Sequence, residues 1–401
     1  MELREGYKFT DVGVIPMDWI TYSVRDLIVL LTDYDANGSF SSVAENVKVY
    51  DYEEYAWYVR STDLENNSSL NNVKYVDEPS YKFLKKTSLN GGELLFLKRG
   101  DIGNVYLFEM KTERATVAPN LYLLKLNQIS ESKYLFYYFV SKVGQRQLKS
   151  KNASSTLGAL YKDDVKSIIV PLPPTKSEQT AIATALSDAD ALINSLSTLI
   201  AKKRNIKQGA MQQLLKPKEG WEVKTLGEIA FVNMGQSPLS EYYNSEGIGL
   251  PLVQGNADVE NRKTIIRFYT SMITKKGKAG DIIMSVRAPV GEIAKATSEC
   301  CLGRGVCSIS FDNEYLYHYL IYFEKSWAKL STGSTFDSVN SKQVKELEIP
   351  IPISKEEQTR IATILSDMDA EIQALVTKLE KYRKIKLGMM QNLLTGKIRL
   401  I

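Results

Sequence analysis

The chain has 401 residues, enough for two or three domains that each bury a core of their own. Hydrophobic residues make up 44% and charged residues 24%, which argues against long disorder and against a fibrous chain. The net charge of +4 permits nucleic acid as a partner without requiring it. The chain start has no apolar signal core, and no apolar run is long enough to span a bilayer, so we expect a cytoplasmic protein without membrane association.

Histidine and cysteine usage restricts the chemistry. His318 is the one histidine, and it lies in the aromatic run YLYHYLIYF, where we expect it to pack within a helix. Histidine-based triads and multi-histidine metal centres are thereby excluded, and we expect neither a catalytic residue nor a metal site. Cys300, Cys301 and Cys307 are odd in number and close together, which favours buried thiols in a reducing compartment over disulfides.

Residues 1–170 are expected to form a first globular domain of short β-type runs broken by polar loops. Asn37 and Ser39 lie on such a loop and are of the types that hydrogen-bond to base edges, so they are candidate DNA contacts. Arg99 follows an apolar strand and precedes a glycine-containing turn. It is a candidate for a phosphate or base contact, with a structural ion pair as an equally weighted alternative. An alternating aromatic series is expected in the core, with DNA contact as the less favoured alternative: Tyr50, Tyr55, Trp57 and Tyr58.

Residues 171–216 are expected to form a helical spacer. Thr175 and Glu178 have the S/T-x-x-E spacing of a capping box, in which the hydroxyl caps the helix and the carboxylate reaches back to the cap residue. Apolar residues then recur at steps of four and three, the period of a coiled-coil seam; they include Ile182, Leu186, Ile193 and Leu196. About 40 helical residues would make a rod of roughly 60 Å.

Residues 217–349 are expected to form a second globular domain with β-type runs such as GDIIMSV and CSISF. Its polar loop GQSPLSEYY holds the candidate DNA contacts Gln236, Ser237, Tyr242 and Tyr243, although the Gly235–Ser237 segment is equally consistent with a simple turn. Arg287 occupies the place in this domain that Arg99 occupies in the first, with the same two interpretations.

Residues 350–401 are expected to form a second helical spacer and a tail. Segment 350–394 repeats segment 171–215 without a gap, and 26 of the 45 aligned pairs are identical, so the chain is an internal duplication. Ser354 and Glu357 repeat the capping spacing, and the seam continues through Ile361, Leu365, Met368, Ile372, Leu375 and Leu379. Each helix is acidic in its first half and basic in its second. We expect a solvated face that complements the helix dipole, with partner docking or phosphate contact as the alternative.

These motifs resemble those of the specificity subunit of type I restriction-modification systems, over essentially the full length. The resemblance rests on PLPPxxxEQxxIAxxL and IPIPxxxEQxxIAxxL, on the helix ends MQQLL and MQNLLTGKIRL, and on GDIIxSVRxxxGEI. It implies an α+β protein with two target recognition domains. Two long helices forming an antiparallel coiled coil would separate these domains in a pseudo-twofold repeat.

The resemblance also implies a function and partners. The chain would bind double-stranded DNA, with each domain reading one half of a bipartite target. Its helices would dock two modification (methyltransferase) subunits, and restriction subunits would join the full complex. S-adenosylmethionine, ATP and Mg²⁺ would belong to those partners, because this chain has no GxxxxGK[ST] phosphate loop and no methyltransferase tetrapeptide. The alternatives are a coiled-coil scaffold that binds proteins, and a stand-alone endonuclease using Asp101, Glu109 and Lys111.

Overall fold

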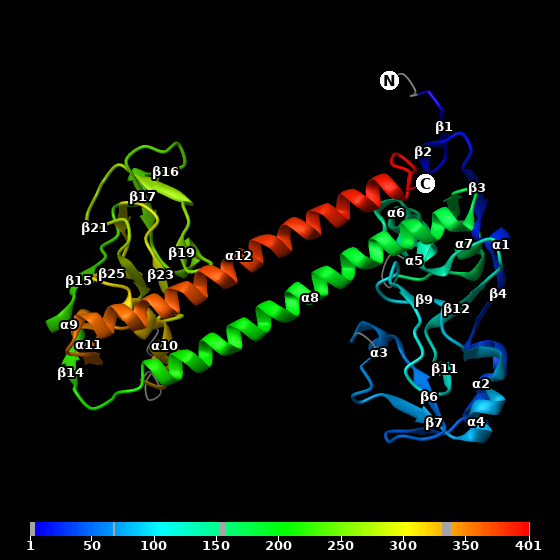
Figure 1. Ribbon diagram of the computed structural model, residues 1–401, viewed down its shortest axis with the longest axis horizontal. Helices are drawn as coiled ribbons and strands as arrows, with labels where there is room; N and C mark the ends of the chain where they lie inside the picture. Colours follow the sequence, from blue (N-terminus) through cyan, green and yellow to red (C-terminus); the bar gives the residue numbers. More distant parts are fainter. Residues whose placement is uncertain (1–4, 67–68, 153–157, 331–337, 401) are drawn as a thin grey trace. The chain divides into compact units, whose positions relative to one another are not determined.

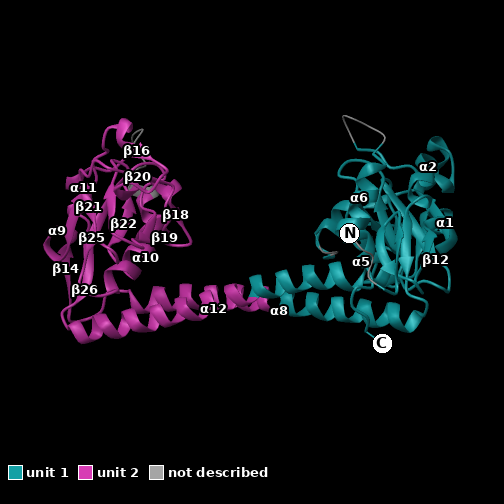
Figure 2. Ribbon diagram, turned by 90° about the horizontal axis from the view of Figure 1, so that it is seen from above, with its two compact units in different colours: residues 1–195, 379–401 teal, residues 196–378 magenta. Residues whose placement is uncertain are grey.

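Two helices of 39 residues dominate the architecture: α8 (Lys176–Leu214) and α12 (Lys355–Leu393). The computed structural model, which describes residues 5–66, 69–152, 158–330 and 338–400, divides into two compact units (Figure 1). Unit 1 comprises Met1–Ser195 and Leu379–Ile401, and unit 2 comprises Leu196–Lys378, so both helices pass from one unit into the other (Figure 2). Each helix begins five residues after its predicted spacer boundary, because each predicted spacer opens inside a strand, β13 (Ile169–Leu172) or β26 (Glu348–Pro352).

The predicted helix caps are half right. The Thr175 hydroxyl accepts a hydrogen bond from the Glu178 N–H at 3.2 Å, and the Ser354 hydroxyl accepts one from the Glu357 N–H at 3.3 Å. The predicted return of the Glu178 carboxylate to its cap residue is wrong. That carboxylate is fully buried and binds Arg399, whose Nη2 lies 2.8 Å from Oε2. A guanidinium is the stronger partner, because a buried charge needs an opposite charge.

Unit 1 is built around a four-stranded sheet and a five-stranded sheet. The four-stranded sheet has the order β10-β9-β12-β4, and the five-stranded sheet has the order β5-β7-β6-β11-β8. The bounds of these strands are β4 Ile28–Asp33, β5 Val49–Tyr50, β6 Ala56–Val59, β7 Lys74–Val76, β8 Ser88–Leu89, β9 Leu94–Leu97, β10 Val105–Leu107, β11 Ala115–Val117 and β12 Leu121–Leu126.

The remaining elements of unit 1 flank these sheets. Two further antiparallel pairs form from β1 (Tyr7–Thr10) with β2 (Gly13–Pro16), and from β3 (Ile20–Ser23) with β13 (Ile169–Leu172). The short helices are α1 Val24–Leu27, η1 Tyr34–Asn37, α2 Phe40–Asn46, α3 Ser61–Glu65, α4 Glu78–Phe83, η2 Lys85–Thr87, α5 Ser132–Val140, α6 Lys142–Ser150 and α7 Lys162–Lys166.

Unit 2 contains a six-stranded sheet of order β15-β25-β22-β23-β19-β18 and a five-stranded sheet of order β16-β20-β17-β24-β21, besides the pair β14-β26. Its strands are β14 Trp221–Thr225, β15 Phe231–Met234, β16 Tyr243–Asn244, β17 Leu250–Val253, β18 Val259–Glu260, β19 Lys263–Thr264, β20 Phe268–Thr270, β21 Lys276–Gly277, β22 Ile282–Ser285, β23 Ile293–Lys295, β24 Cys300–Leu302, β25 Val306–Ser310 and β26 Glu348–Pro352. Its short helices are α9 Leu226–Ile229, η3 Ser240–Tyr242, η4 Asn256–Asp258, α10 Tyr315–Leu330 and α11 Ser341–Lys345.

The two units share one topology, although their sequences differ much more than the helices do. In both five-stranded sheets the third and fourth strands pair in parallel, β6 with β11 and β17 with β24. The neighbouring pairs are antiparallel in both sheets. Likewise, the order β10-β9-β12-β4 matches β23-β22-β25-β15. The predicted α+β class and the predicted internal repeat are confirmed. Unit 2 adds the β18-β19 hairpin to its sheet, whereas unit 1 adds α2, α3 and α4.

The first turns of each long helix pack against the core of a globular unit, and the later turns pack against the other helix. Ile182 and Leu186 are fully buried in the unit 1 core, and Ile361 and Leu365 are fully buried in the unit 2 core. Among the other predicted seam residues, Leu196 and Leu379 are buried, and Ile193, Met368, Ile372 and Leu375 are half-buried. A domain that covers one side of the helix explains why burial is greatest at each helix start.

The charges of the helices form ion pairs between them. In unit 2, Lys203 pairs with Glu371 at 2.6 Å and Lys207 pairs with Asp369 at 2.5 Å. In unit 1, Lys386 pairs with Asp190 at 2.5 Å. In unit 2 the paired residue numbers rise on α8 as they fall on α12, so the two helix segments run antiparallel there. For these side chains, the expectation of a merely solvated face is therefore wrong.

Candidate nucleic-acid interface

Arg99 and Arg287 occupy the same place in the two units. Each follows the strand at the centre of its sheet, β9 or β22, and each forms an antiparallel bridge with a distant segment: Arg99 with Ala159, and Arg287 with Ser338. The residue before each arginine repeats the contact, since its carbonyl accepts a backbone hydrogen bond of 2.9 Å from Leu160 in unit 1 and from Val339 in unit 2. Both arginine side chains are exposed. The duplication has thus preserved a backbone frame that presents one arginine per unit.

In unit 2 the turn 303–305 holds this frame together. The Val286 N–H donates to the Gly305 carbonyl at 2.9 Å, and the Gly303 N–H donates to the Val253 carbonyl at 2.7 Å. A Cβ atom at Gly305 would lie 2.0 Å from the Gln254 carbonyl oxygen, so only glycine permits this approach. Unit 1 repeats the arrangement, with the Asn120 carbonyl accepting from the Lys98 N–H at 2.9 Å.

The loop after β15 brings Gln236 and Ser237 to the same turn. The Gln236 N–H donates to the Leu302 carbonyl at 2.8 Å, and the Arg304 N–H donates to the Ser237 hydroxyl at 3.1 Å. Gln236 and Arg304 are both exposed. Three residues predicted from the sequence, Gln236, Ser237 and Arg287, therefore meet around Arg304. The sequence reasoning missed Arg304, whose signal is a single cation between two glycines. We call residues 235–242, 286–289 and 303–305 the unit 2 loop cluster.

The two predicted tyrosines of this loop have different surroundings. The Tyr243 hydroxyl donates to the Pro238 carbonyl at 3.2 Å, so it braces the loop. Tyr242 ends η3 and remains 41% exposed. Tyr242 is therefore the tyrosine of the pair that is available to a ligand.

In unit 1, Asn37 and Ser39 hold the shape of the corresponding loop. The Asn37 amide donates to the Tyr34 carbonyl and to the Thr87 hydroxyl, both at 3.0 Å, and its oxygen accepts from the Lys86 N–H at 3.2 Å. Ser39 caps α2 by accepting from the Ser42 N–H. In this conformation the Asn37 amide is already hydrogen-bonded within the protein. We call residues 33–40, 98–100 and 118–120 the unit 1 loop cluster.

Acidic residues neutralise the lysines beside Arg99. The buried Asp33 carboxylate lies 2.8 Å from both Lys98 Nζ and Lys162 Nζ, and Asp35 lies 2.8 Å from Lys98 Nζ. Burial by itself would raise the pKa of Asp33, but the hydrogen bonds from Lys162 and Lys98 outweigh burial and lower that pKa. By contrast, Arg99, Arg287 and Arg304 form no ion pair with any acidic residue among those described. Their charges remain available to an anionic ligand.

The described residues offer no metal centre and no reactive thiol. They include no group of three or more His, Cys, Asp or Glu side chains placed to hold a metal ion. All three cysteines are free and buried, and burial raises the pKa of Cys300 to about 11 and that of Cys307 to about 12. In the described part of the chain, no helix is both long and apolar enough to cross a membrane.

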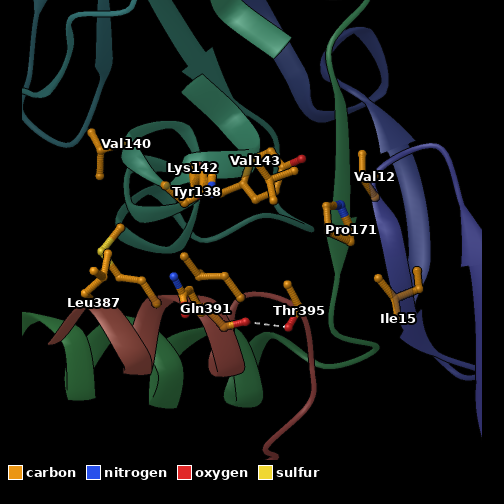
Figure 3. Close-up of a pocket in the computed structure, with 13 residues that line it drawn as sticks. Val12, Ile15, Tyr138, Val140, Lys142, Val143, Pro171, Leu387, Gln391 and Thr395 are labelled. Carbon is orange, nitrogen blue, oxygen red and sulfur yellow. Dashed lines mark hydrogen bonds between the residues drawn. The ribbon is translucent and has the colours of Figure 1, made fainter. Parts of the chain in front are cut away.

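An apolar cavity of about 110 Å³ lies away from the loop cluster in unit 1, where the end of α12 meets α5, α6 and the β1-β2 hairpin (Figure 3). Leu387, Met390 and Leu394 line it from α12 and its end, opposite Val143 and Ile15. The Thr395 hydroxyl is turned toward the helix and donates to the Gln391 carbonyl at 2.6 Å (Figure 3). The cavity therefore presents a mainly hydrocarbon lining.

Sequence comparison matches both halves of the chain to one family. Residues 16–207 and 218–383 each match the family model described as the type I restriction modification DNA specificity domain. A relative named for the specificity subunit of restriction enzyme MjaX of Methanocaldococcus jannaschii is 30% identical, over 99% of this chain and 97% of its own. The MjaVIII specificity subunit of the same organism is 25% identical, over 99% and 96%.

Solved structures show the same fold. A type I restriction-modification S subunit from Mycoplasma genitalium has a TM-score of 0.64 at 17% identity and covers 98% of both chains. A chain from a study of the assembly and conformational transition of a type I restriction-modification system has a TM-score of 0.61 at 21% identity, over 96% of this chain and 99% of that one. These similarities extend the fold to both units and both helices.

Proposed function

The chain belongs to the type I restriction-modification DNA specificity subunits, and from this premise we propose that each unit reads one half of a bipartite double-stranded DNA target. Membership of this family makes the chain a non-catalytic subunit that supplies DNA sequence specificity. The alternatives of a protein-binding scaffold and a stand-alone endonuclease are not favoured.

The observation that carries the proposal is the duplicated arginine frame. Arg99 and Arg287 end equivalent strands and make equivalent bridges, so each unit offers one arginine from the same backbone position. An arginine in such a place can bind guanine through two hydrogen bonds or bind a phosphate. The neighbouring turn differs, with Pro119 in unit 1 at the place of Arg304 in unit 2. One frame with different side chains suits two units that read different bases.

The partners follow from the same membership. A subunit that only supplies specificity needs other subunits of its restriction-modification system for the chemistry. We expect two modification (methyltransferase) subunits to dock on α8 and α12, one for each copy of the repeated helix, and restriction subunits to complete the complex. S-adenosylmethionine, ATP and Mg²⁺ would be bound by those partners, and the assembly would work in the cytoplasm.

The test is to map the target with single-arginine variants. The chain and its partner subunits are expressed together, and the methylated sites in the host DNA are sequenced to give the bipartite target. Arg99→Ala should relax the base preference in one half only, and Arg287→Ala in the other half only. In each case affinity for the original target should fall by about 5- to 150-fold, because a bidentate base contact is worth about 1–3 kcal/mol.

Lysine variants at the same positions separate the two kinds of arginine contact. A phosphate contact tolerates Arg→Lys, whereas a bidentate base contact does not. The proposal fails if both alanine variants leave the target and the affinity at matched salt unchanged, or if one variant relaxes both halves equally.

A further inference from the structure

Phe40 is the most exposed large hydrophobic side chain among the described residues, at 93% exposure. It is the first residue of α2 and follows Ser39 in the unit 1 loop cluster. Full burial of a phenylalanine is worth about 1.5–3 kcal/mol, so leaving its ring in water forgoes that stabilisation. A single exposed hydrophobic side chain is common on protein surfaces and by itself indicates no function. The hydrogen bonds of the loop that carries Phe40 show whether its ring is held in one orientation.

The loop that presents Phe40 is braced at several points. The Asn37 amide makes three hydrogen bonds, and Lys86 Nζ donates to the Ala36 carbonyl at 2.8 Å. Gly38 lies close to the Phe83 ring, since a Cβ atom at Gly38 would be 3.2 Å from Phe83 Cζ. The Ser39 hydroxyl fixes the first turn of α2. The ring of Phe40 is therefore held outward by a preorganised loop.

The surroundings of Phe40 are polar and partly cationic. Lys85 and Lys86 are exposed on η2, the segment against which this loop is hydrogen-bonded. The same loop reaches Lys98 through Asp35, which neutralises that lysine, and the exposed Arg99 follows Lys98 in the chain. An exposed aromatic ring on a loop that is hydrogen-bonded to a segment with two exposed lysines suits a partner that has both flat apolar faces and negative charge. Nucleic acid combines stacked bases with phosphates in this way.

Unit 2 presents an apolar side chain at the corresponding loop. Leu239 follows Pro238 in the loop after β15 and is 59% exposed. This loop is held by the Tyr243 hydroxyl at the Pro238 carbonyl and by the Ser237 hydroxyl at the Arg304 N–H. In Figure 2, β16 of unit 2 and α2 of unit 1 each lie at the side of their own unit that is away from its helix segments. The repeated frame thus combines an arginine with an exposed apolar tip in both units.

We propose that Phe40 is a wedge residue that inserts at a base step of the half-site read by unit 1, and that Leu239 has the same role in unit 2. The proposal rests on the DNA-reading function of the two loop clusters. Phenylalanine and leucine are among the side chains that wedge between bases and unstack them. Pyrimidine–purine steps unstack most easily, so each wedge would favour such a step through DNA deformability, without a hydrogen bond to a base.

The experiment uses the chain assembled with its partner subunits and a duplex carrying the mapped target. Phe40→Ala should weaken binding to that duplex by about 5- to 150-fold, the range expected when one base–aromatic stack is removed. Phe40→Trp should keep most of the affinity, because its ring also stacks. Phe231→Ala is the matched control, since Phe231 is another phenylalanine at 69% exposure but lies at the start of β15, away from the loop tip. It should bind like the unchanged protein.

A fluorescent base reports the wedge directly. With 2-aminopurine placed in turn at each step of the unit 1 half-site, the unchanged protein should raise its fluorescence at one step, and Phe40→Ala should abolish that rise. Leu239→Ala should do the same only in the other half-site.

Two results would overturn the inference. In the first, Phe40→Ala binds DNA normally while Arg99→Ala loses affinity, which leaves the proposed function standing and removes the wedge. In the second, Phe40→Ala prevents assembly with the partner subunits in the absence of DNA, as measured by sedimentation, which would assign the ring to a protein contact. The failure of both arginine variants would instead count against the proposed function.

Discussion

The single histidine takes the place of a tyrosine in the other unit. In unit 1 the Tyr137 hydroxyl donates to Asp190 at 2.9 Å, and Lys386 pairs with the other oxygen of that carboxylate. In unit 2, Lys207 pairs with the corresponding Asp369, but His318 Nδ1 lies 3.9 Å from that carboxylate and makes no hydrogen bond. His318 Nε2 is 2.9 Å from the Ser366 hydroxyl. One buried nitrogen is therefore left without a partner, which costs about 1–3 kcal/mol.

We predict that His318→Tyr stabilises unit 2. The new hydroxyl would reach Asp369 as Tyr137 reaches Asp190, and a cleft of about 460 Å³ beside His318 leaves room for the larger ring. The expected gain is about 1 kcal/mol, the usual net value of one hydrogen bond. Thermal unfolding at pH 7 measures it. His318→Phe is the matched control without the hydroxyl, and a Tyr variant no more stable than the Phe variant would contradict the prediction.

The same residue predicts an acid sensitivity. Burial first, and then the charge of Lys207, lower the pKa of His318 to about 4, against about 6.5 in the unfolded chain. Between pH 6.5 and 4 the unfolded state binds the proton more tightly, so the contribution of His318 to stability is complete above pH 6.5 and is lost as the pH falls through this window. The loss is at most about 3 kcal/mol. The midpoint of urea unfolding should therefore fall more between pH 7 and pH 4.5 for the unchanged protein than for His318→Tyr.

For single residues, the sequence predicted which side chains follow a strand or a turn, but it did not predict which residues from distant parts of the chain lie beside them. The arginine after an apolar strand was found twice from the sequence alone, because strand and turn patterns are local. Arg304 was missed because its place beside Ser237 depends on a turn 67 positions away in the chain. A base-reading role for Asn37 is less favoured for a similar reason, since the atoms that occupy its amide come partly from Lys86 and Thr87.

The elements that were predicted best are the two long helices, because their apolar period and their hydroxyl caps are local signals and the duplication shows both signals twice. Their charge pattern is complementary only when the two helices run antiparallel. An acidic first half then faces a basic second half, so Lys203 meets Glu371 and Lys386 meets Asp190. A parallel arrangement would place like charges together. The charges thus favour the antiparallel orientation.

We predict that a charge in the seam unfolds the helix pair. Leu379 on α12 is 7% exposed, so Leu379→Asp should cost about 3–5 kcal/mol from the lost apolar packing and the buried carboxylate. Ile385→Asp is the matched control on the same helix, where the side chain is already 41% exposed, and it should change the free energy of unfolding by much less. Helix content during thermal unfolding, followed by circular dichroism, compares the two. Equal losses would mean that Leu379 does not lie in a buried seam.

At the scale of the whole molecule, the C-terminal tail packs against the N-terminal segment in unit 1. Arg399 binds Asp18, with an Nη1–Oδ1 distance of 3.0 Å, and it also binds the buried Glu178. The Tyr7 hydroxyl donates to the Gly396 carbonyl at 3.1 Å. The first and last described segments therefore lie side by side in unit 1. At the equivalent place in unit 2, the end of α8 continues through the exposed residues 216–220 directly into β14.

This equivalence predicts a functional circular permutant. A short glycine-rich linker joins the two ends in unit 1, and the chain is opened at residues 216–220, where the described backbone is exposed and belongs to no helix or strand. The permutant should melt close to the unchanged protein and, with its partner subunits, bind the same DNA target, since the core packing and the Arg399 ion pairs are kept. A control opened between Lys202 and Lys203 interrupts α8 and should lose both properties. Loss of folding in the first permutant would contradict the prediction. It would show that unit 2 needs the covalent connection through residues 216–220, whereas unit 1 folds without a covalent connection at the equivalent place.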